Sequence, residues 1–253
     1  MRKLRRGVKQ AEVLRGEVLA FEKSDAYVLK TEREPRGPQE VKYICHAIRQ
    51  RDAPMDWPLA IGDTIYNLRC ALDHVVYAKW RSRKAMFPIY VDKCEFQVRG
   101  TPRIAGLSPT LRADIESVQP YRTIPEQPDL DPLAVLHELS NLDKHRELST
   151  VSNFLDVPWV ASSVPPTTQF SFEYTGEGKP MNEETHVLTF VLIGPEANSV
   201  HVHPDFSFEV RVEGRGLRDV LEQITRRVGL IVQQMDAGLR LPALSRPVHD
   251  QDP

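Results

Sequence analysis

Apolar and polar positions follow two different periods along the chain, and each stretch of one period predicts an element. Helical spacing of apolar side chains occupies residues 4–22 and returns over 57–81, 131–150 and 216–237. Residues 26–48 instead alternate around a Pro-Gly-Pro turn region, which is typical of a β-hairpin. Residues 154–213 form β-branched and aromatic runs separated by Gly, Pro and Asn. The pattern predicts an α+β fold with four long helices, an N-terminal β-hairpin and a C-terminal antiparallel β-rich portion.

The ends of these elements carry recognisable signals. Asp131 is a good N-cap residue, and Pro132 suits the first position of a helix. Gly216 precedes the last helix, and the segment 241–253 that follows this helix is Pro-rich and polar. We therefore expect a single α+β domain over residues 1–240, followed by a disordered tail over 241–253.

Composition is that of an ordinary globular protein. The 253 residues are 41% hydrophobic and 27% charged. No apolar run approaches the ~18 residues that a membrane span needs, and no apolar stretch of the secretory type follows the basic N-terminus. Three scattered cysteines do not make a disulfide framework or a Cys-rich zinc site. We expect a cytoplasmic protein that makes no contact with membranes and needs no cofactor or metal.

Charge is nearly balanced over the whole chain but not along it. The formal net charge is −2, so no general field attracts nucleic acid. The first nine residues nevertheless hold five basic side chains, which are Arg2, Lys3, Arg5, Arg6 and Lys9. Such a cluster can contact phosphate, or it can be an ordinary solvated surface.

The helix predicted over 57–81 has two distinct faces at ~100° per residue. The apolar face holds Ile61, Ile65, Leu68, Leu72, Val75 and Val76. The opposite stripe holds Asp63, Asn67, Cys70, His74 and Tyr77. These stripe residues are short or hydrogen-bonding types, which favours a helix–helix interface or the wall of a cleft over plain solvation. We expect a homodimer through Asp63, Asn67, Cys70 and His74.

The string NLRCALDH, residues 67–74, places four residues between Arg69 and His74. This spacing resembles the R-X4–6-H signature of the HEPN (higher eukaryote and prokaryote nucleotide-binding) superfamily. The strings GDTIYNLRCALDHVVYA, FPI, VQPY and NLDKHREL also resemble a group of uncharacterised bacterial proteins, which implies no activity. The HEPN resemblance implies a helical bundle that dimerises so that two Arg–His pairs form one metal-independent endoribonuclease site. It equally admits an RNA-binding protein, and it suggests a toxin or defence effector.

The chemistry implied by this resemblance is plausible for these side chains. Neutral His74 can take a proton from an RNA 2′-hydroxyl or give one to the leaving 5′-oxygen, as a general acid and base. Arg69 can hold the phosphate oxygens as negative charge builds, and Asn67 can hold the imidazole or the phosphate. Asp73 lies four residues after Arg69 and offers the alternative of a helical ion pair.

A second cluster lies on the helix predicted over 131–150. His137, Asn141 and Lys144 share one helical face, and His145 lies on its flank. These side chains can bind an anion or orient a phosphate. Alternatively, His137 and Asn141 make hydrogen bonds that only serve the bundle.

Two other classes of function stay open on the sequence. The first is a non-catalytic interaction or ligand-binding module, favoured by Cys70 directly after Arg69, where many HEPN ribonucleases have Asn, Asp or His, and by the near-neutral charge. The second, more distant, is a metalloprotein that uses His201 and His203, which share one side of a strand. Such a site needs a third ligand, which His186 or Asp205 could supply.

Overall fold

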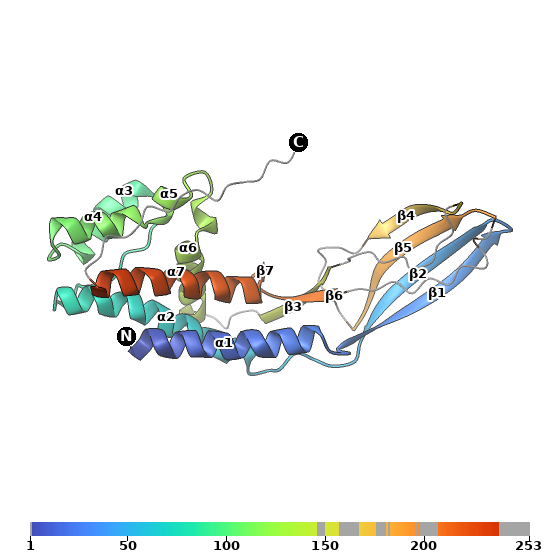
Figure 1. Ribbon diagram of the computed structural model, residues 1–253, viewed down its shortest axis with the longest axis horizontal. Coiled ribbons are helices and arrows are strands. Elements are labelled where there is room, and N and C mark those ends of the chain that lie inside the picture. The colour runs from blue at the N-terminus through green and yellow to red at the C-terminus, as the bar shows by residue number, and fades with distance from the viewer. Residues whose placement is uncertain are drawn as a thin grey trace. The chain divides into compact units, whose positions relative to one another are not determined.

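A computed structural model describes residues 2–145, 150–156, 167–175, 181, 183–195, 197 and 207–237. Helices and two antiparallel sheets are both present, so the expected α+β class is confirmed (Figure 1). Contacts divide the chain into two compact units. The helical unit comprises Met1–Leu14, Pro58–Leu148 and Asp219–Pro253, and the sheet unit comprises Arg15–Trp57 and Ser149–Arg218. The single domain expected over 1–240 stays a prediction.

The longer helices lie close to the segments with helical spacing. They are α1 (Arg2–Glu22), α2 (Trp57–Lys79), α6 (Pro132–His145) and α7 (Leu217–Ala237). Between α2 and α6 the chain forms the short helices α3 (Lys93–Glu95), α4 (Pro109–Ser117) and α5 (Pro120–Thr123), joined by η1 (Phe96–Gly100), η2 (Thr101–Arg103) and η3 (Pro128–Leu130). The unit boundary falls within α1 and at the first turn of α7, so both helices supply residues to both units.

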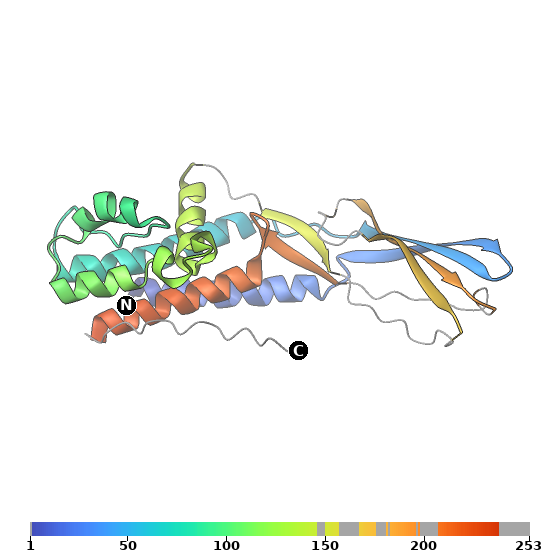
Figure 2. The ribbon, with the colours of Figure 1, turned by 90° about the horizontal axis from the view of Figure 1, so that it is seen from above.

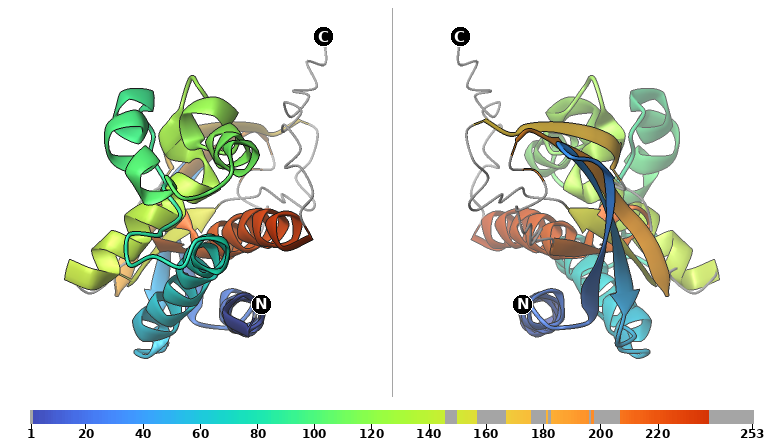
Figure 3. Two further views of the ribbon diagram at one scale, coloured as in Figure 1. Left: turned by 90° about the vertical axis from the view of Figure 1, so that its left-hand side faces the viewer. Right: turned by 90° about the vertical axis from the view of Figure 1, so that its right-hand side faces the viewer.

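The core of the helical unit is built on the apolar face of α2. The face predicted from helical spacing is buried, as the exposures of Ile61, Ile65, Leu68 and Leu72 show. Helix α1 packs alongside α2 (Figures 2 and 3), and Gly7 permits the close approach. A Cβ atom at position 7 would lie 2.9 Å from Cδ2 of Leu68. The absence of a side chain at Gly7 therefore sets how closely α1 approaches α2.

Helix α6 begins where its sequence predicts and ends earlier. Oδ1 of Asp131 accepts a hydrogen bond from the backbone N–H of Leu133 at 2.8 Å, which confirms Asp131 as the N-cap. The helix ends at His145, and Thr150 already belongs to β3 (Thr150–Asp156). The expected end at residue 150 is therefore wrong. Thr150 and Val151 are β-branched, and such residues favour a strand.

The sheet unit contains two antiparallel sheets. The larger has the order β1-β2-β5-β4, formed by β1 (Tyr27–Gly37), β2 (Glu40–Arg49), β5 (Glu184–Ile193) and β4 (Gln169–Thr175). The hairpin expected over 26–48 is confirmed as β1 and β2, whose register pairs Tyr27 with Arg49. The smaller sheet joins β3 to β6 (Ser207–Val212) and β7 (Arg215–Gly216). In the turn between β6 and β7, Gly214 has φ of 77°, a conformation that glycine adopts without strain.

The buried part of the larger sheet lies on β2 and β5, whereas β1 is almost wholly exposed beyond Tyr27. Val41, Tyr43, Cys45 and Ala47 alternate along β2 on the buried face. The ring of Tyr43 stacks on that of Phe190 in β5, with 5.0 Å between centroids.

The tail expected over 241–253 lies outside the described residues. Among the helices that the structure describes, none has the length and apolar character to cross a membrane.

Candidate functional site

Arg69 is held inside the helical unit by two fixed partners. Its Nη2 donates to the backbone oxygen of Phe87 at 2.5 Å and to Oδ1 of Asp73 at 3.2 Å. The same oxygen of Asp73 accepts from the backbone N–H of Phe87 at 2.9 Å. Arg69 and Asp73 therefore bind both backbone groups of Phe87, whose side chain is fully buried. The ion pair that the spacing of Arg69 and Asp73 allowed is confirmed.

The surroundings of Arg69 are unusual for a guanidinium group. The residue is 8% exposed, and within the described part of the chain its buried Nη1 has no hydrogen-bond partner. Burial lowers the pKa of Arg69, and the nearby Asp73 carboxylate opposes that effect. A guanidinium in this position secures the segment after α2, because it cannot reach solvent without breaking its bond to Phe87.

His74 lies on the surface of α2, and Arg69 lies inside. The two residues are about 140° apart around the helix at ~100° per residue, so their side chains leave it in different directions. The fold therefore does not bring the Arg69 guanidinium and the His74 imidazole to one place within a single chain. A composite site formed by two chains stays a prediction.

Asn67 is not part of a free stripe. It is buried, and its Nδ2 donates to Oε1 of Gln10 at 2.8 Å while its Oδ1 accepts from Nζ of Lys3 at 3.1 Å. Both partners come from α1. The expectation that Asn67 faces a second subunit is wrong, because α1 of the same chain covers it. Asp63 and His74 stay exposed, Cys70 is half-buried, and the homodimer stays a prediction.

The uncovered part of α2 carries two exposed aromatic rings, and one of them, that of Tyr66, lies beside the basic end of α1. Tyr66 is 51% exposed and Tyr77 is 50% exposed. The ammonium of Lys3 lies 4.8 Å from the centroid of the Tyr66 ring, within the range of a cation–π interaction. A hydrogen bond to Cys70 raises the pKa of the Tyr66 hydroxyl. We call the surface formed here the α1–α2 face, which comprises half-buried Lys3 and the exposed residues Arg2, Arg6, Lys9, Tyr66, His74 and Tyr77.

The second predicted cluster is only partly described. His137 and Asn141 are both exposed on α6, and Nε2 of the imidazole lies 3.2 Å from Nδ2 of the amide. The expected shared face of these two residues is therefore present, with the hydrogen bond that the structural alternative required. The side chains of Lys144 and His145 lie outside the described residues, so anion binding there stays a prediction.

The proposed metal ligands are also only partly described. His201, His203 and Asp205 lie outside the described residues. His186 lies on β5, where its Nε2 is 2.6 Å from Oγ1 of Thr189 and its ring stacks on that of His46. Among the described residues, no group of three or more His, Cys, Asp or Glu side chains could hold a metal ion.

Sequence reasoning missed the two contacts that define this region. The bond between Arg69 and the Phe87 carbonyl joins residues 18 apart, and the contact of Lys3 with Tyr66 joins the first and second helices. One signal for the aromatic part was present, since Tyr66 and Tyr77 share a side of one helix at a spacing of eleven residues.

Comparison with known protein families, curated proteins and solved structures found no match. The HEPN relationship thus stays a prediction.

Proposed function

We propose that the α1–α2 face binds single-stranded RNA. The observation that carries this proposal is the contact of Lys3 with the exposed ring of Tyr66, which joins the basic end of α1 to the aromatic side of α2. Proteins that bind single strands combine cationic side chains for the phosphates with aromatic rings on which bases stack. Both kinds of side chain are exposed on this face.

The basic residues of α1 are free to meet phosphate. Arg2, Arg6 and Lys9 follow one another at spacings of four and three residues, so they share one side of the helix. All three are exposed, and within the described part of the chain they form no ion pair. Cations without a carboxylate partner can neutralise phosphates and release bound counterions. This row supplies the electrostatic half of the proposed interface.

The aromatic residues of α2 supply the other half. Half-exposed Tyr66 and Tyr77 offer ring surface for stacking, which favours unpaired bases over a closed duplex. His74 is exposed between them along the helix and can donate a hydrogen bond to a phosphate or a base. The interface therefore suits single strands and has little base specificity.

The geometry favours binding over cleavage. A phosphate clamp must present its guanidinium to the ligand, and Arg69 presents its guanidinium to Asp73 and to the Phe87 carbonyl. Under this proposal Arg69 stabilises the fold, and His74 contacts RNA without acting as half of an Arg–His pair.

Fluorescence anisotropy with a labelled oligouridine tests the proposal. We expect Arg2→Gln, Arg6→Gln and Lys9→Gln together to weaken binding at least about tenfold, because three phosphate contacts are lost. The matched control replaces Lys93, Arg99 and Arg103, which are exposed on α3, η1 and η2, with Gln. This control removes the same charge and should leave affinity almost unchanged. Equal losses in both triple variants would show that net charge, rather than the α1–α2 face, governs binding.

A single substitution tests the stacking contribution. Tyr66→Ala should weaken binding about tenfold, since stacking of one base on an aromatic ring contributes ~1–3 kcal/mol. Tyr66→Phe keeps the ring and should bind like the wild type. A Phe variant as weak as the Ala variant would assign the contribution to the Tyr66 hydroxyl and would contradict stacking.

A further inference from the structure

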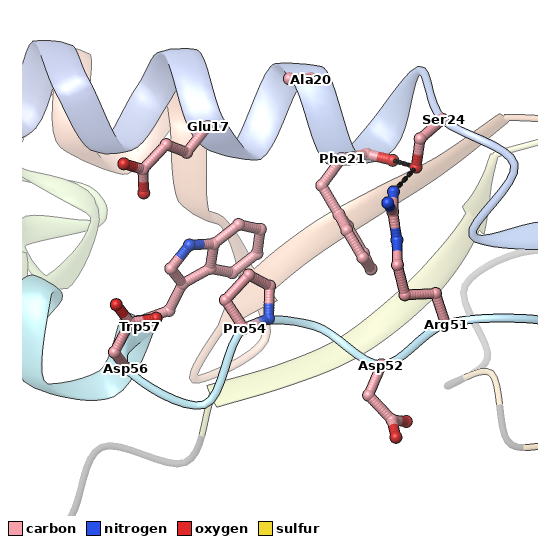
Figure 4. Close-up of a pocket in the computed structure, with 9 residues that line it drawn as sticks. All are labelled: Glu17, Ala20, Phe21, Ser24, Arg51, Asp52, Pro54, Asp56 and Trp57. Carbon is pink, nitrogen blue, oxygen red and sulfur yellow. Dashed lines mark hydrogen bonds between the residues drawn. The ribbon is translucent and has the colours of Figure 1, made fainter.

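A separate pocket lies in the sheet unit, between the end of α1 and the loop that leads into α2 (Figure 4). Its volume is about 630 Å³, a size typical of ligand sites. Nine residues line it, namely Glu17, Ala20, Phe21, Ser24, Arg51, Asp52, Pro54, Asp56 and Trp57. All nine belong to the sheet unit, so the pocket is complete within one compact part of the chain.

The wall of the pocket is a fixed pair of aromatic rings. Phe21 and Trp57 meet edge to face, with 5.4 Å between centroids and 80° between planes. Both are buried, and Trp57 is 1% exposed. The indole N–H of Trp57 points into the pocket (Figure 4), and in the described part of the chain it has no hydrogen-bond partner. This N–H can therefore donate to an acceptor that a ligand brings.

Two carboxylates lie on either side of this indole N–H. Figure 4 shows Glu17 on one side of it and Asp56 on the other. Neither carboxylate forms an ion pair with a described residue. The third acid, Asp52, is different, because its Oδ1 lies 3.0 Å from Nη1 of Arg49. Glu17 and Asp56 are therefore the acids available to a cation in the pocket.

The chain itself already places a guanidinium against this wall. The guanidinium carbon of Arg51 lies 5.5 Å from the centroid of the Phe21 ring, and its Nη2 donates to Oγ of Ser24 at 2.5 Å. A flat cation thus packs on one end of the aromatic pair. The other end, where Trp57 lies beside Glu17 and Asp56, offers the indole N–H together with unpaired acids.

We propose that this pocket binds an arginine or lysine side chain of a peptide partner. The cationic group lies between Glu17 and Asp56, and a neighbouring peptide carbonyl accepts a hydrogen bond from the indole N–H. Both carboxylates and the indole N–H then have a partner. The proposal does not depend on RNA binding by the α1–α2 face, which is built from residues of the helical unit.

Titration followed by the ¹H–¹⁵N signal of the indole tests the proposal on the full-length chain. Trp57→Phe identifies the Trp57 signal among those of the three tryptophans. We expect N-acetyl-arginine amide to shift that signal in a saturable way, and N-acetyl-citrulline amide, which has the same shape without the charge, to bind at least about tenfold more weakly. Equal binding of the two compounds would overturn the proposal. Tighter binding of free arginine than of the capped form would assign the pocket to a small amino acid and would also overturn it.

Variants then locate the site. Glu17→Gln with Asp56→Asn should weaken binding of N-acetyl-arginine amide at least about tenfold, because both counter-charges are lost. Glu12→Gln is a control for the loss of one charge, since Glu12 is exposed on the same helix and does not line the pocket. An unchanged position of the Trp57 signal in the free double variant shows that the pocket is intact. Unchanged affinity in that intact double variant would contradict the proposal.

Discussion

Arg69 and His74 are five positions apart in the sequence, yet their environments predict opposite responses to substitution. Arg69→Ala leaves the Phe87 carbonyl without its side-chain donor and the Asp73 carboxylate without its counter-charge, and we expect it to lower the free energy of unfolding by about 3 kcal/mol. His74→Ala removes an exposed side chain and should change that quantity by less than about 0.5 kcal/mol. Urea unfolding measures both. A larger loss for His74→Ala than for Arg69→Ala would contradict the assigned roles.

The sequence could predict half of the Arg69 environment. The sequence places Asp73 four residues after Arg69, and this helical spacing predicted the ion pair. The Phe87 carbonyl could not be predicted, because the connector after α2 returns to the helix by tertiary packing that leaves no local pattern. Arg–X4–His spacing fixes an angle around a helix, but it does not say which side of that helix is covered.

Glu22 gives the sheet unit a pH dependence of known sign. The carboxylate accepts from the backbone N–H of Val210 at 2.9 Å and lies 2.6 Å from Nε of Arg218. Burial raises the pKa of Glu22 above its ordinary value of 4.5, and the contacts with Val210 and Arg218 only partly oppose this rise. Above pH 4.5 the folded chain therefore holds more protons at Glu22 than the unfolded chain, so stability is lost as pH rises through the window up to the raised pKa.

Glu22→Gln removes this titration. We expect the wild type to lose stability relative to the variant as pH rises from about 4 to about 7 in urea unfolding experiments. The comparison between the two proteins cancels the other carboxylates, which are common to both. A wild type that gains stability relative to Glu22→Gln over this range would contradict the raised pKa.

At the scale of the elements, Asp131 joins three helices through one buried carboxylate. It caps α6 through Leu133, its Oδ2 accepts a hydrogen bond from the Thr123 hydroxyl in α5, and it lies 3.9 Å from Nη2 of Arg227 in α7. Asp131→Asn keeps an acceptor for the cap but leaves buried Arg227 without a counter-charge, which should cost about 3 kcal/mol. Asp131→Ala should cost about 1 kcal/mol more, because the cap is also lost. The midpoint of thermal unfolding should be highest for the wild type, lower for Asp131→Asn and lowest for Asp131→Ala. An Ala variant as stable as the Asn variant would show that the cap does not stabilise α6.

The elements themselves followed from local periodicity where one face of each is buried. The apolar faces of α2 and β2 repeat at the helix and strand periods, so both could be predicted. The element that covers a second face of a helix could not be predicted. Asn67 is polar and lies outside the apolar stripe, yet α1 covers it through Gln10 and Lys3, because polar pairs can pack between helices as well as face solvent. This contact removes Asn67 alone from the expected dimer face, and Asp63 and His74 of that face stay exposed.

At the scale of the whole molecule, the buried position of Arg69 predicts binding without cleavage. We expect oligouridine and a structured RNA to remain intact with the protein in EDTA. The reason is that the Arg69 guanidinium is buried and does not face the RNA together with His74. Gel analysis of labelled RNA is the measurement. His74-dependent cleavage that Arg69→Lys also abolishes would show that Arg69 leaves its internal bonds, and it would restore the ribonuclease hypothesis. His74→Ala identifies any contaminating nuclease, since such an activity would survive the substitution.

The α+β class could be predicted from the order of helical and strand periods, but the division into two units could not. Segments far apart in the sequence make up each unit, such as Arg15–Trp57 with Ser149–Arg218. Local patterns show which residues are buried and do not show which distant segment buries them. The pocket around Trp57 has the same origin, because α1 and the loop before α2 come together only in the fold.

The salt dependence of RNA binding tests the central claim most directly. Each phosphate contact with a single strand contributes ~0.7 to the slope of log affinity against log salt concentration. We predict that the Arg2, Arg6 and Lys9 triple variant reduces the magnitude of this slope by about 2 relative to the wild type, while the Lys93, Arg99 and Arg103 control leaves it unchanged. Equal slopes for the wild type and the α1 triple variant would mean that these cations do not contact phosphate. The α1–α2 face would then not be the RNA-binding surface.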